Sequence, residues 1–175
     1  MLIRAAQPGD EMGVADVHVR SWQAAYKGLL PDDYLNGLRP EQRAQRYTFG
    51  SHDLRQPFTI VSTEASLITG FATISPARDP DIPDHGELCA LYVAPEWWGC
   101  GIGAALVSEA RDLLHERGFR SAALWVMANN TRAERFYRID QWMPDGLRRT
   151  DTVWGIVVDE IRYRRVLDMP GTART

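Results

Sequence analysis

The stretch that most constrains the fold runs from Leu91 to Leu106, with the sequence LYVAPEWWGCGIGAAL. It begins as an apolar run typical of a strand and breaks at Pro95, whose nitrogen cannot donate to a β-ladder. Glycines then occupy the alternate positions 99, 101 and 103. Beyond them, apolar residues recur at the spacing of an amphipathic helix: Ile102, Leu106, Ala110 and Leu113. The segment therefore predicts a strand, a glycine-rich turn and a helix.

A turn of this kind favours an anion. The first N–H groups of a helix have no partner within the helix, and the helix dipole is positive at that end. Glycine lets a phosphate approach the backbone because no Cβ stands in the way. We therefore expect a phosphate-bearing ligand at residues 98–104. The same turn also fits a strand–helix connection that binds nothing.

A dinucleotide is a second alternative, because Gly99-x-Gly101-x-x-Ala104 fits a loose dinucleotide fingerprint. A dinucleotide site needs a carboxylate for the ribose at the end of the next strand, about 20 residues on. The next strand-like run is 121–126, and neither it nor the following residues 127–130 contain Asp or Glu. This absence argues against a nucleotide-dependent oxidoreductase.

A second motif follows at 130–137, Asn-Thr-Arg-Ala-Glu-Arg-Phe-Tyr. It resembles the Asn-x-x-Ala-x-x-Phe-Tyr helix that forms the second half of the acetyl-CoA site in the GNAT acetyltransferase superfamily. The first motif is similar to the Pro-x-x-[Gln/Arg]-Gly-x-Gly-Ile-Gly turn of that family. Trp98 stands where the family has Gln or Arg. Whether a side chain at this position contacts the pyrophosphate is therefore an open question, whereas contacts from the backbone amides are still expected. With the flanking strands, the resemblance covers most of the chain.

The resemblance implies an α/β GNAT fold. Its central sheet is mixed and mostly antiparallel, splays apart at the acetyl-CoA site and carries helices on both faces. The length of 175 residues suits one domain with a single core. We expect an N-acetyltransferase domain over residues 1–167 and a flexible tail over 168–175.

The implied activity is transfer of acetyl from acetyl-CoA to a primary amine by direct attack, without a metal. Val93 is expected to direct its N–H at the thioester oxygen, and Tyr137 to protonate the departing sulfur. The alternative for Tyr137 is packing beside Phe136. The residues expected to hold acetyl-CoA are Leu91, Tyr92, Val93, Trp98, Gly99, Cys100, Gly101, Ile102, Gly103, Ala104, Asn130, Ala133, Phe136 and Tyr137.

Glu87 is the residue that the resemblance implies as the base, acting directly or through water. Period-two alternation on the central strand would place it on one face with Cys89, Leu91 and Val93. A solvated edge glutamate is the alternative. Further candidates for the base are His85, Asp145 and Asp151.

Trp22 and Tyr26 are candidates for the wall of the acceptor pocket. The pattern Trp-x-x-x-Tyr-x-Gly that contains them is similar to the helical pair that forms this wall in one branch of the family. Their spacing of four residues also fits plain core packing on a helix. Both interpretations stand at this point.

The remaining elements follow from local pattern. We expect a strand at 2–6, a helix capped by Asp10, helical pieces at 32–38 and 40–47, and a hairpin at 58–75. Residues 78–84 predict a loop with solvated acidic side chains, and 143–150 a turn-rich connection before strands at 153–158 and 160–166. Thr131 and Glu134 predict a capping box. Where the family usually ends this helix with a Gly-Phe pair, the chain has Gln141 and Trp142. Because a side chain is strained in the left-handed region, this departure from the resemblance predicts an unusual helix end.

Composition excludes several classes of protein. A net charge of −3 gives no case for nucleic acid, and no apolar run approaches the roughly 20 residues of a membrane span. Two cysteines are too few for a disulfide framework and indicate no metal, so a cytoplasmic protein is the simplest interpretation. The expected partners are acetyl-CoA and an amine acceptor, either a small molecule or a peptide. The acceptor's identity and a homodimer stay open, and the runner-up function is a non-catalytic acyl-CoA-binding module.

Overall fold

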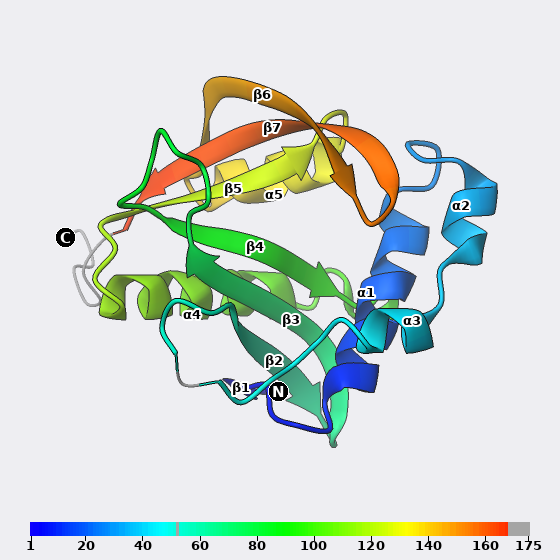
Figure 1. Ribbon diagram of the computed structural model, residues 1–175. Coiled ribbons are helices and arrows are strands. Elements are labelled where there is room, and N and C mark those ends of the chain that lie inside the picture. Colours follow the sequence, from blue (N-terminus) through cyan, green and yellow to red (C-terminus); the bar gives the residue numbers. More distant parts are fainter. Residues whose placement is uncertain (52, 168–175) are drawn as a thin grey trace.

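The computed structural model describes residues 1–51 and 53–167, so the predicted tail at 168–175 lies outside the described residues and its boundary stays a prediction. The described chain forms one seven-stranded sheet in the order β1-β2-β3-β4-β5-β7-β6 (Figure 1). Its first strands are β1 (Leu2–Ala5), β2 (Phe58–Glu64), β3 (Leu67–Pro76) and β4 (Gly86–Val93). They pair antiparallel, which confirms the predicted first strand and hairpin.

The parallel pair of β4 and β5 (Ser121–Met127) is the feature that opens the sheet. Pairing is confined to Gly86 with Ala122 and Glu87 with Ala123, although both strands continue for several residues. Beyond these two pairs the strands diverge (Figure 1). The mixed, mostly antiparallel sheet is therefore confirmed, and it splays at its centre as predicted.

The C-terminal part corrects one prediction. The expected turn-rich connection at 143–150 is wrong, because β6 spans Met143–Val153 and forms an antiparallel hairpin with β7, Ile156–Val166. The hairpin turns at Trp154 and Gly155, which both have positive φ. Since β6 is the last strand of the sheet and most of its side chains are exposed, its sequence carries no alternation that would reveal a strand.

Two helices cover one face of the sheet. α4 (Ile102–Glu116) and α5 (Thr131–Ile139) pack on a cluster that includes Leu106, Leu124 and Tyr163. α4 buries Ile102, Leu106 and Ala110 of the predicted apolar stripe, and Gly118 adopts positive φ just beyond the helix end. This face holds the helix that begins at the glycine-rich turn.

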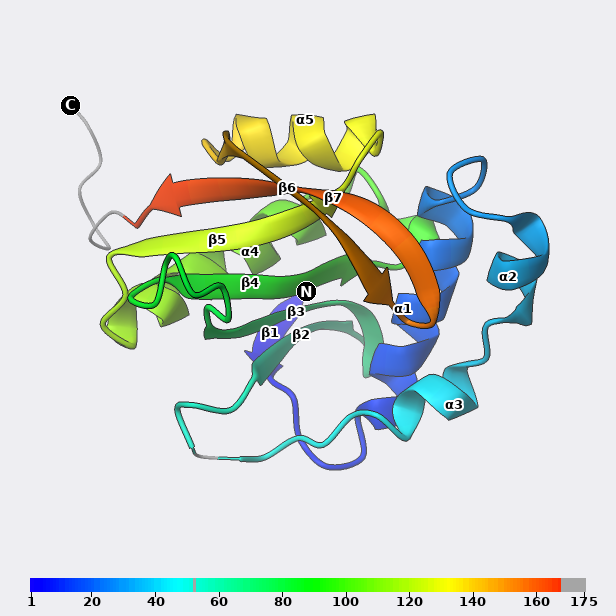
Figure 2. The same ribbon diagram turned by 45° about the horizontal axis from the view of Figure 1, so that its top comes forward.

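The other face is covered by α1 (Glu11–Ala25). α2 (Asp32–Gly37) adds Leu35 to a cluster with Trp22 and Val158, and α3 (Pro40–Ala44) packs against α1. The β6–β7 turn curls towards α1 (Figure 2). Trp154, at that turn, packs edge-on against Trp22 with ring centroids 4.8 Å apart. Helices on both faces are thus confirmed. Among the helices of the described chain, none is long and apolar enough to span a membrane.

The helix starts differ in detail from the predictions. Asp10 does occupy the N-cap of α1, but its carboxylate accepts hydrogen bonds from Arg4 and from the N–H of Gln7 and makes no side-chain cap bond. At α5, the predicted capping box is wrong. Asn130 is the N-cap and accepts from the N–H of Ala133 at 3.1 Å, while Glu134 accepts from the Tyr163 hydroxyl.

The end of α5 also corrects a prediction. Gln141 adopts φ of +65°, so the helix has the ordinary left-handed ending despite the side chain. The N–H of Trp142 bonds to the carbonyl of Tyr137, and that of Gln141 to Arg138, which is a Schellman motif. Trp142 is fully buried against the core. Burial of this indole offsets the roughly 1 kcal/mol of strain at Gln141.

Candidate functional site

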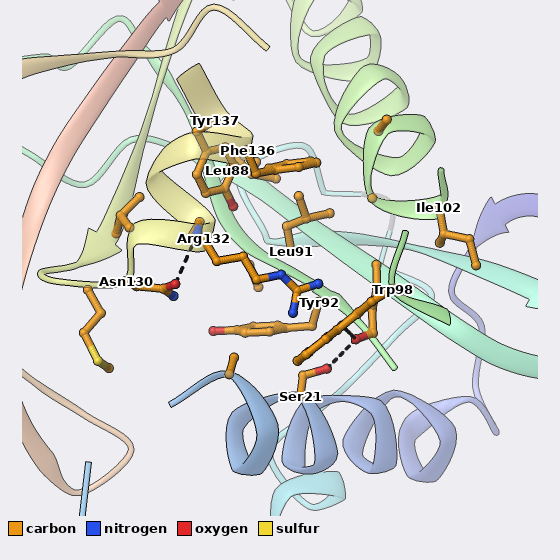
Figure 3. A pocket seen from close by; sticks show the side chains of 18 of the residues that line it. Ser21, Leu88, Leu91, Tyr92, Trp98, Ile102, Asn130, Arg132, Phe136 and Tyr137 are labelled. Atoms are coloured by element: carbon orange, nitrogen blue, oxygen red, sulfur yellow. Dashed lines mark hydrogen bonds between the residues drawn. The ribbon is translucent and has the colours of Figure 1, made fainter. Parts of the chain in front are cut away.

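A cavity of about 380 Å³ occupies the opening between β4 and β5. It is lined from β4, β5, the glycine-rich turn, α1 and the start of α5, segments far apart in the sequence (Figure 3). Most of the predicted site residues meet in it, namely Tyr26, Leu91, Tyr92, Val93, Trp98, Gly99, Gly101, Ile102, Gly103, Ala104, Asn130, Ala133, Phe136 and Tyr137. A volume of this size is ordinary for a small-molecule site.

Three predicted site residues do not line the cavity: Cys100, Trp22 and Glu87. The Cys100 thiol is exposed. Trp22 is 2% exposed and packs edge-on against Tyr26 with ring centroids 4.9 Å apart. The core-packing interpretation therefore fits Trp22, whereas Tyr26 contributes to the cavity wall.

The predicted face of Glu87 is wrong because of a β-bulge. The register with β3 shifts so that Ile74 pairs with Leu88 while Thr73 pairs with Ala90, which leaves Cys89 as an extra residue. Leu88 and Leu91 consequently pack in the same cluster. Glu87 therefore lies on the opposite face from Leu91, buried and hydrogen-bonded to the exposed Arg78 at 3.2 Å.

The further base candidates are held by arginines away from the cavity. His85 Nε2 lies 2.7 Å from a guanidinium nitrogen of Arg164, and burial followed by that charge lowers the pKa of His85. Asp145 accepts from Arg162 at 2.8 Å. Asp151 lies 3.5 Å from Arg149. Among the described residues, no carboxylate or imidazole lines the cavity.

The glycine-rich turn has the geometry of an anion site. Gly101 is the N-cap of α4 with φ of +81°, a conformation in which L side chains are strained. The first helical bond is that from the N–H of Ala105 to the carbonyl of Gly101. The N–H groups of Ile102, Gly103 and Ala104 precede this bond and therefore have no acceptor within the helix. These three residues also line the cavity.

The β4 edge presents its backbone to the opening. The N–H of Ala94 bonds to Thr69 towards β3, so alternation directs the backbone groups of Val93 the other way, into the gap. There the Val93 carbonyl accepts from Trp98 Nε1 at 2.7 Å and from Ser21 Oγ at 2.8 Å (Figure 3). The carbonyl is thus occupied, and the N–H on the same edge is the group left to face a ligand.

Tyr137 enters the cavity from α5. Burial raises the pKa of its hydroxyl, and the neighbouring Tyr92 and Asp140 raise it further. The group is therefore protonated throughout the neutral pH range and can act only as a donor of its proton. Among the described residues, none accepts a hydrogen bond from this hydroxyl. Burial likewise raises the pKa of Tyr26 and Tyr92.

Trp125, which the sequence prediction missed, forms a wall on β5. Its Nε1 donates to Asp79 at 3.1 Å, and the Arg149 guanidinium lies 3.9 Å from the ring centroid. Asp79 also pairs with Arg162, a side chain that is only 4% exposed. The expectation that all acidic side chains of the 78–84 loop are solvated is therefore wrong for Asp79, because the buried Arg162 on β7 needs a counter-charge.

Other lining residues were missed as well: Ser21, Ala25, Leu88, Cys89, Ala90, Trp97, Val126, Met127 and Arg132. Cys89 is the bulge residue, and its thiol is exposed in the cavity. The protein atoms that partly desolvate it, followed by the charge of Glu87, raise the pKa of this thiol to about 11. The signal for Trp125 and Met127 was available, because they alternate along a strand beside the predicted opening. Arg132 lay inside the second motif at a position that the family pattern leaves free.

These features define a class of site: a cleft for an extended ligand, with an anion site at one end, a free strand edge along it and an apolar interior. Among the described residues there is no grouping of three or more His, Cys, Asp and Glu side chains suited to a metal. The arrangement fits a cosubstrate that carries a phosphate-bearing arm and an amide-containing chain.

Comparison with known proteins identifies the family of enzymes to which this kind of site belongs. The sequence model of the Acetyltransferase (GNAT) family matches residues 20–140. An uncharacterised N-acetyltransferase of Bacillus subtilis, YuaI, is 33% identical over 128 residues, which covers 73% of this chain and 72% of that protein.

Solved structures show the same fold at low identity. The PaiA N-acetyltransferase of Thermoplasma acidophilum, in complex with coenzyme A, aligns with a TM-score of 0.67 and 19% identity over 95% of this chain and 99% of that one. The yncA structure from Salmonella typhimurium, with its cofactor acetyl-CoA, aligns with a TM-score of 0.70 and 18% identity over 99% and 97%. The chain belongs to the GNAT acetyltransferase family, which confirms the predicted family, fold and class of enzyme.

Proposed function

We propose that the protein transfers acetyl from acetyl-CoA to a primary amine by direct attack. The observation that carries this proposal is the splayed β4 edge, with the Val93 N–H and the Tyr137 hydroxyl in the same cavity as the glycine-rich turn. Family membership and the coenzyme A or acetyl-CoA in two structural neighbours support it. A cytoplasmic location and a homodimer stay predictions.

Two parts of the cosubstrate would have partners in the cavity wall. The free N–H groups of Ile102, Gly103 and Ala104 would hold the pyrophosphate. The pantetheine arm would lie along Leu91 and Val93 in place of a neighbouring strand, since β5 has left that edge unpaired. The Asn130 side chain is engaged in capping α5, so its carbonyl oxygen is fixed at the edge of the cavity.

Three groups of the chain would then serve the reaction. The Val93 N–H stabilises the charge that develops on the thioester oxygen, an effect worth on the order of 3 kcal/mol for a preorganised donor. Tyr137 gives its proton to the departing sulfur. The apolar walls, including Tyr26 and Trp125, keep water from the reacting centre and face the acceptor.

Within the described part of the chain, the cavity wall has no carboxylate or imidazole that could take the proton of the amine. Glu87 is screened by Arg78 and lies outside the lining, so a role as base requires a chain of water molecules. Alkylamines have a pKa near that of lysine, about 10.4, and only a small fraction is unprotonated at neutral pH. We therefore expect turnover to rise with pH through the neutral range as the free amine becomes more abundant.

The test measures binding and turnover on the same protein. Acetyl-CoA at 100 times its Kd should stabilise the fold by about 2.7 kcal/mol. For a chain of this size that corresponds to a rise in Tm of roughly 5–10 °C. Release of free thiol with a panel of amines and peptides then reports turnover. A folded protein without any shift at millimolar acetyl-CoA would contradict the proposal, whereas a shift without turnover would favour the non-catalytic binding module.

The variant Gly101→Val tests the anion site, because its side chain would stand at the turn and its backbone would be strained. Gly118→Val is a matched control at the opposite end of α4. Both glycines have positive φ, and a Cβ added at either meets no atom within 4 Å. We expect both variants to lower Tm, and only Gly101→Val to lose the shift given by acetyl-CoA. Equal shifts in both would remove the turn from the binding site.

A further inference from the structure

Arg132 is the one charged side chain that lines the cavity within the described chain. It lies in the first turn of α5 and extends across the cleft to Trp98 on the glycine-rich turn (Figure 3). Its guanidinium carbon is 3.4 Å from the centroid of the indole ring. The two walls of the cleft are thus connected by a cation stacked on an aromatic face.

The position of Trp98 is itself fixed. Its Nε1 donates to the Val93 carbonyl at 2.7 Å, so the ring is held against the β4 edge. The face of the ring provides the surface on which the arginine stacks. An Arg–Trp stack restricts the rotamers of a long side chain that would otherwise sample many. Arg132 and Trp98 line the same cavity as Ile102, Gly103 and Ala104, so the cation and the free N–H groups of the turn face one cleft.

No carboxylate of the described residues forms an ion pair with Arg132, whereas many other arginines of this chain are paired. Desolvation in the cleft lowers the pKa of its guanidinium, which nevertheless stays charged at neutral pH. An uncompensated cation in an otherwise uncharged cleft, which a helix N-terminus also lines, is an arrangement that an anion completes.

We propose that Arg132 is the side chain that binds the diphosphate of the cosubstrate, and that Trp98 holds it in place for that contact. This inference rests on the proposed use of acetyl-CoA and assigns a residue to its recognition. Trp98 occupies the position where the family has Gln or Arg, so the phosphate contact is supplied here by a side chain from α5. The planar guanidinium can donate two parallel hydrogen bonds to phosphate oxygens.

The experiment compares binding of coenzyme A, dephospho-coenzyme A and pantetheine to the whole protein by calorimetry. The variants are Arg132→Ala, Arg132→Lys and Arg135→Ala. Arg135 is a matched control, since it lies one turn further along α5, is exposed and does not line the cavity. Melting temperatures of all variants show whether each remains folded.

Loss of one charge-assisted phosphate contact should weaken binding of coenzyme A and of dephospho-coenzyme A to Arg132→Ala about 10- to 100-fold. Binding of pantetheine, which has no phosphate, should change less than about 2-fold, and Arg135→Ala should resemble the native protein for all three ligands. The affinity of Arg132→Ala should also depend less on salt, because one ion contact is missing. Arg132→Lys should recover part of the loss, since it keeps the charge.

Three results would overturn the inference while leaving the proposed function intact. Arg132→Ala could bind coenzyme A as tightly as Arg135→Ala does. It could lose pantetheine to the same degree as coenzyme A, which would indicate packing and not charge. It could lose coenzyme A but keep dephospho-coenzyme A, which would assign the contact to the 3′-phosphate. Failure of the native protein to bind coenzyme A at all would instead refute the proposed function.

Discussion

The substitution Tyr137→Phe tests the chemistry most directly, because it removes one hydroxyl and little else. The ring packs edge-on against Phe136 and Trp142, with centroids 5.2 and 6.3 Å apart, and phenylalanine keeps both contacts. No described residue accepts a hydrogen bond from the hydroxyl, so its removal leaves no orphaned partner. We therefore expect the free energy of unfolding to change by less than about 0.5 kcal/mol.

The expected effect on rate follows from the leaving group. A thiol has a pKa near 8.5 and a phenol near 10, so the sulfur is already a fair leaving group. General-acid assistance is typically worth 10²–10⁴-fold, and the low end applies here. A 10²-fold fall in kcat corresponds to about 2.7 kcal/mol. That value lies within the roughly 1.5–3 kcal/mol of a hydrogen bond to a charged group.

The assay measures kcat and acetyl-CoA affinity on the same two proteins with any accepted amine. Affinity should stay within about 2-fold, because the proton transfer stabilises only the transition state. Since burial raises the pKa of Tyr137, the hydroxyl does not ionise in the assay range, and both proteins should share the same rise of rate with pH up to about 9. Equal kcat values would remove Tyr137 from the mechanism, leaving the Val93 N–H and the binding geometry to account for the rate.

Two further predictions concern stability. Gln141→Gly should raise the free energy of unfolding by up to about 1 kcal/mol, or Tm by roughly 2–4 °C, because φ at this position is +65°, whereas Gln141→Ala should have little effect; an equal gain in both would place the cause elsewhere. His18 is buried, and burial followed by the charge of Arg43 lowers its pKa well below 6.5. The unfolded chain therefore takes up a proton below pH 6.5 that the folded chain does not, and stability should fall by up to about 1.4 kcal/mol per pH unit there. Denaturant titrations of His18→Gln between pH 7 and 5 should show a flatter dependence than the native protein, and an unchanged slope would show that other groups cause it.

Local sequence pattern was sufficient to predict a helix, strand or turn wherever a single segment contains the whole pattern. The glycine-rich turn between residues 98 and 104 is an example, since only glycine adopts the positive φ of Gly101 without strain and the apolar stripe beyond it has helical spacing. The exposed strand β6 gave no such signal, because an edge strand with both faces in solvent needs no apolar alternation.

Within the site, too, local pattern predicted some features and missed others. Most residues of the two motifs line one cavity, as the resemblance implied, whereas Glu87 does not. The extra residue Cys89 shifts the alternation of β4, so Glu87 lies on the opposite face of the sheet from Leu91. A bulge depends on how two strands pair, and pairing is a relation between distant segments. Alternation along one strand cannot reveal it.

Motifs and periodicity along the chain were therefore enough to predict the elements around the glycine-rich turn, the order of the two motifs and the family to which they point. Which side chains share the cleft with them depends on how distant elements pack. Arg132 meets Trp98, Asp79 holds Trp125, and Ser21 reaches the Val93 carbonyl from α1, each across many residues of chain. The physical reason is that propensity and periodicity are local properties. The contacts that set charge and access at the site form instead between elements that meet around the opening between β4 and β5.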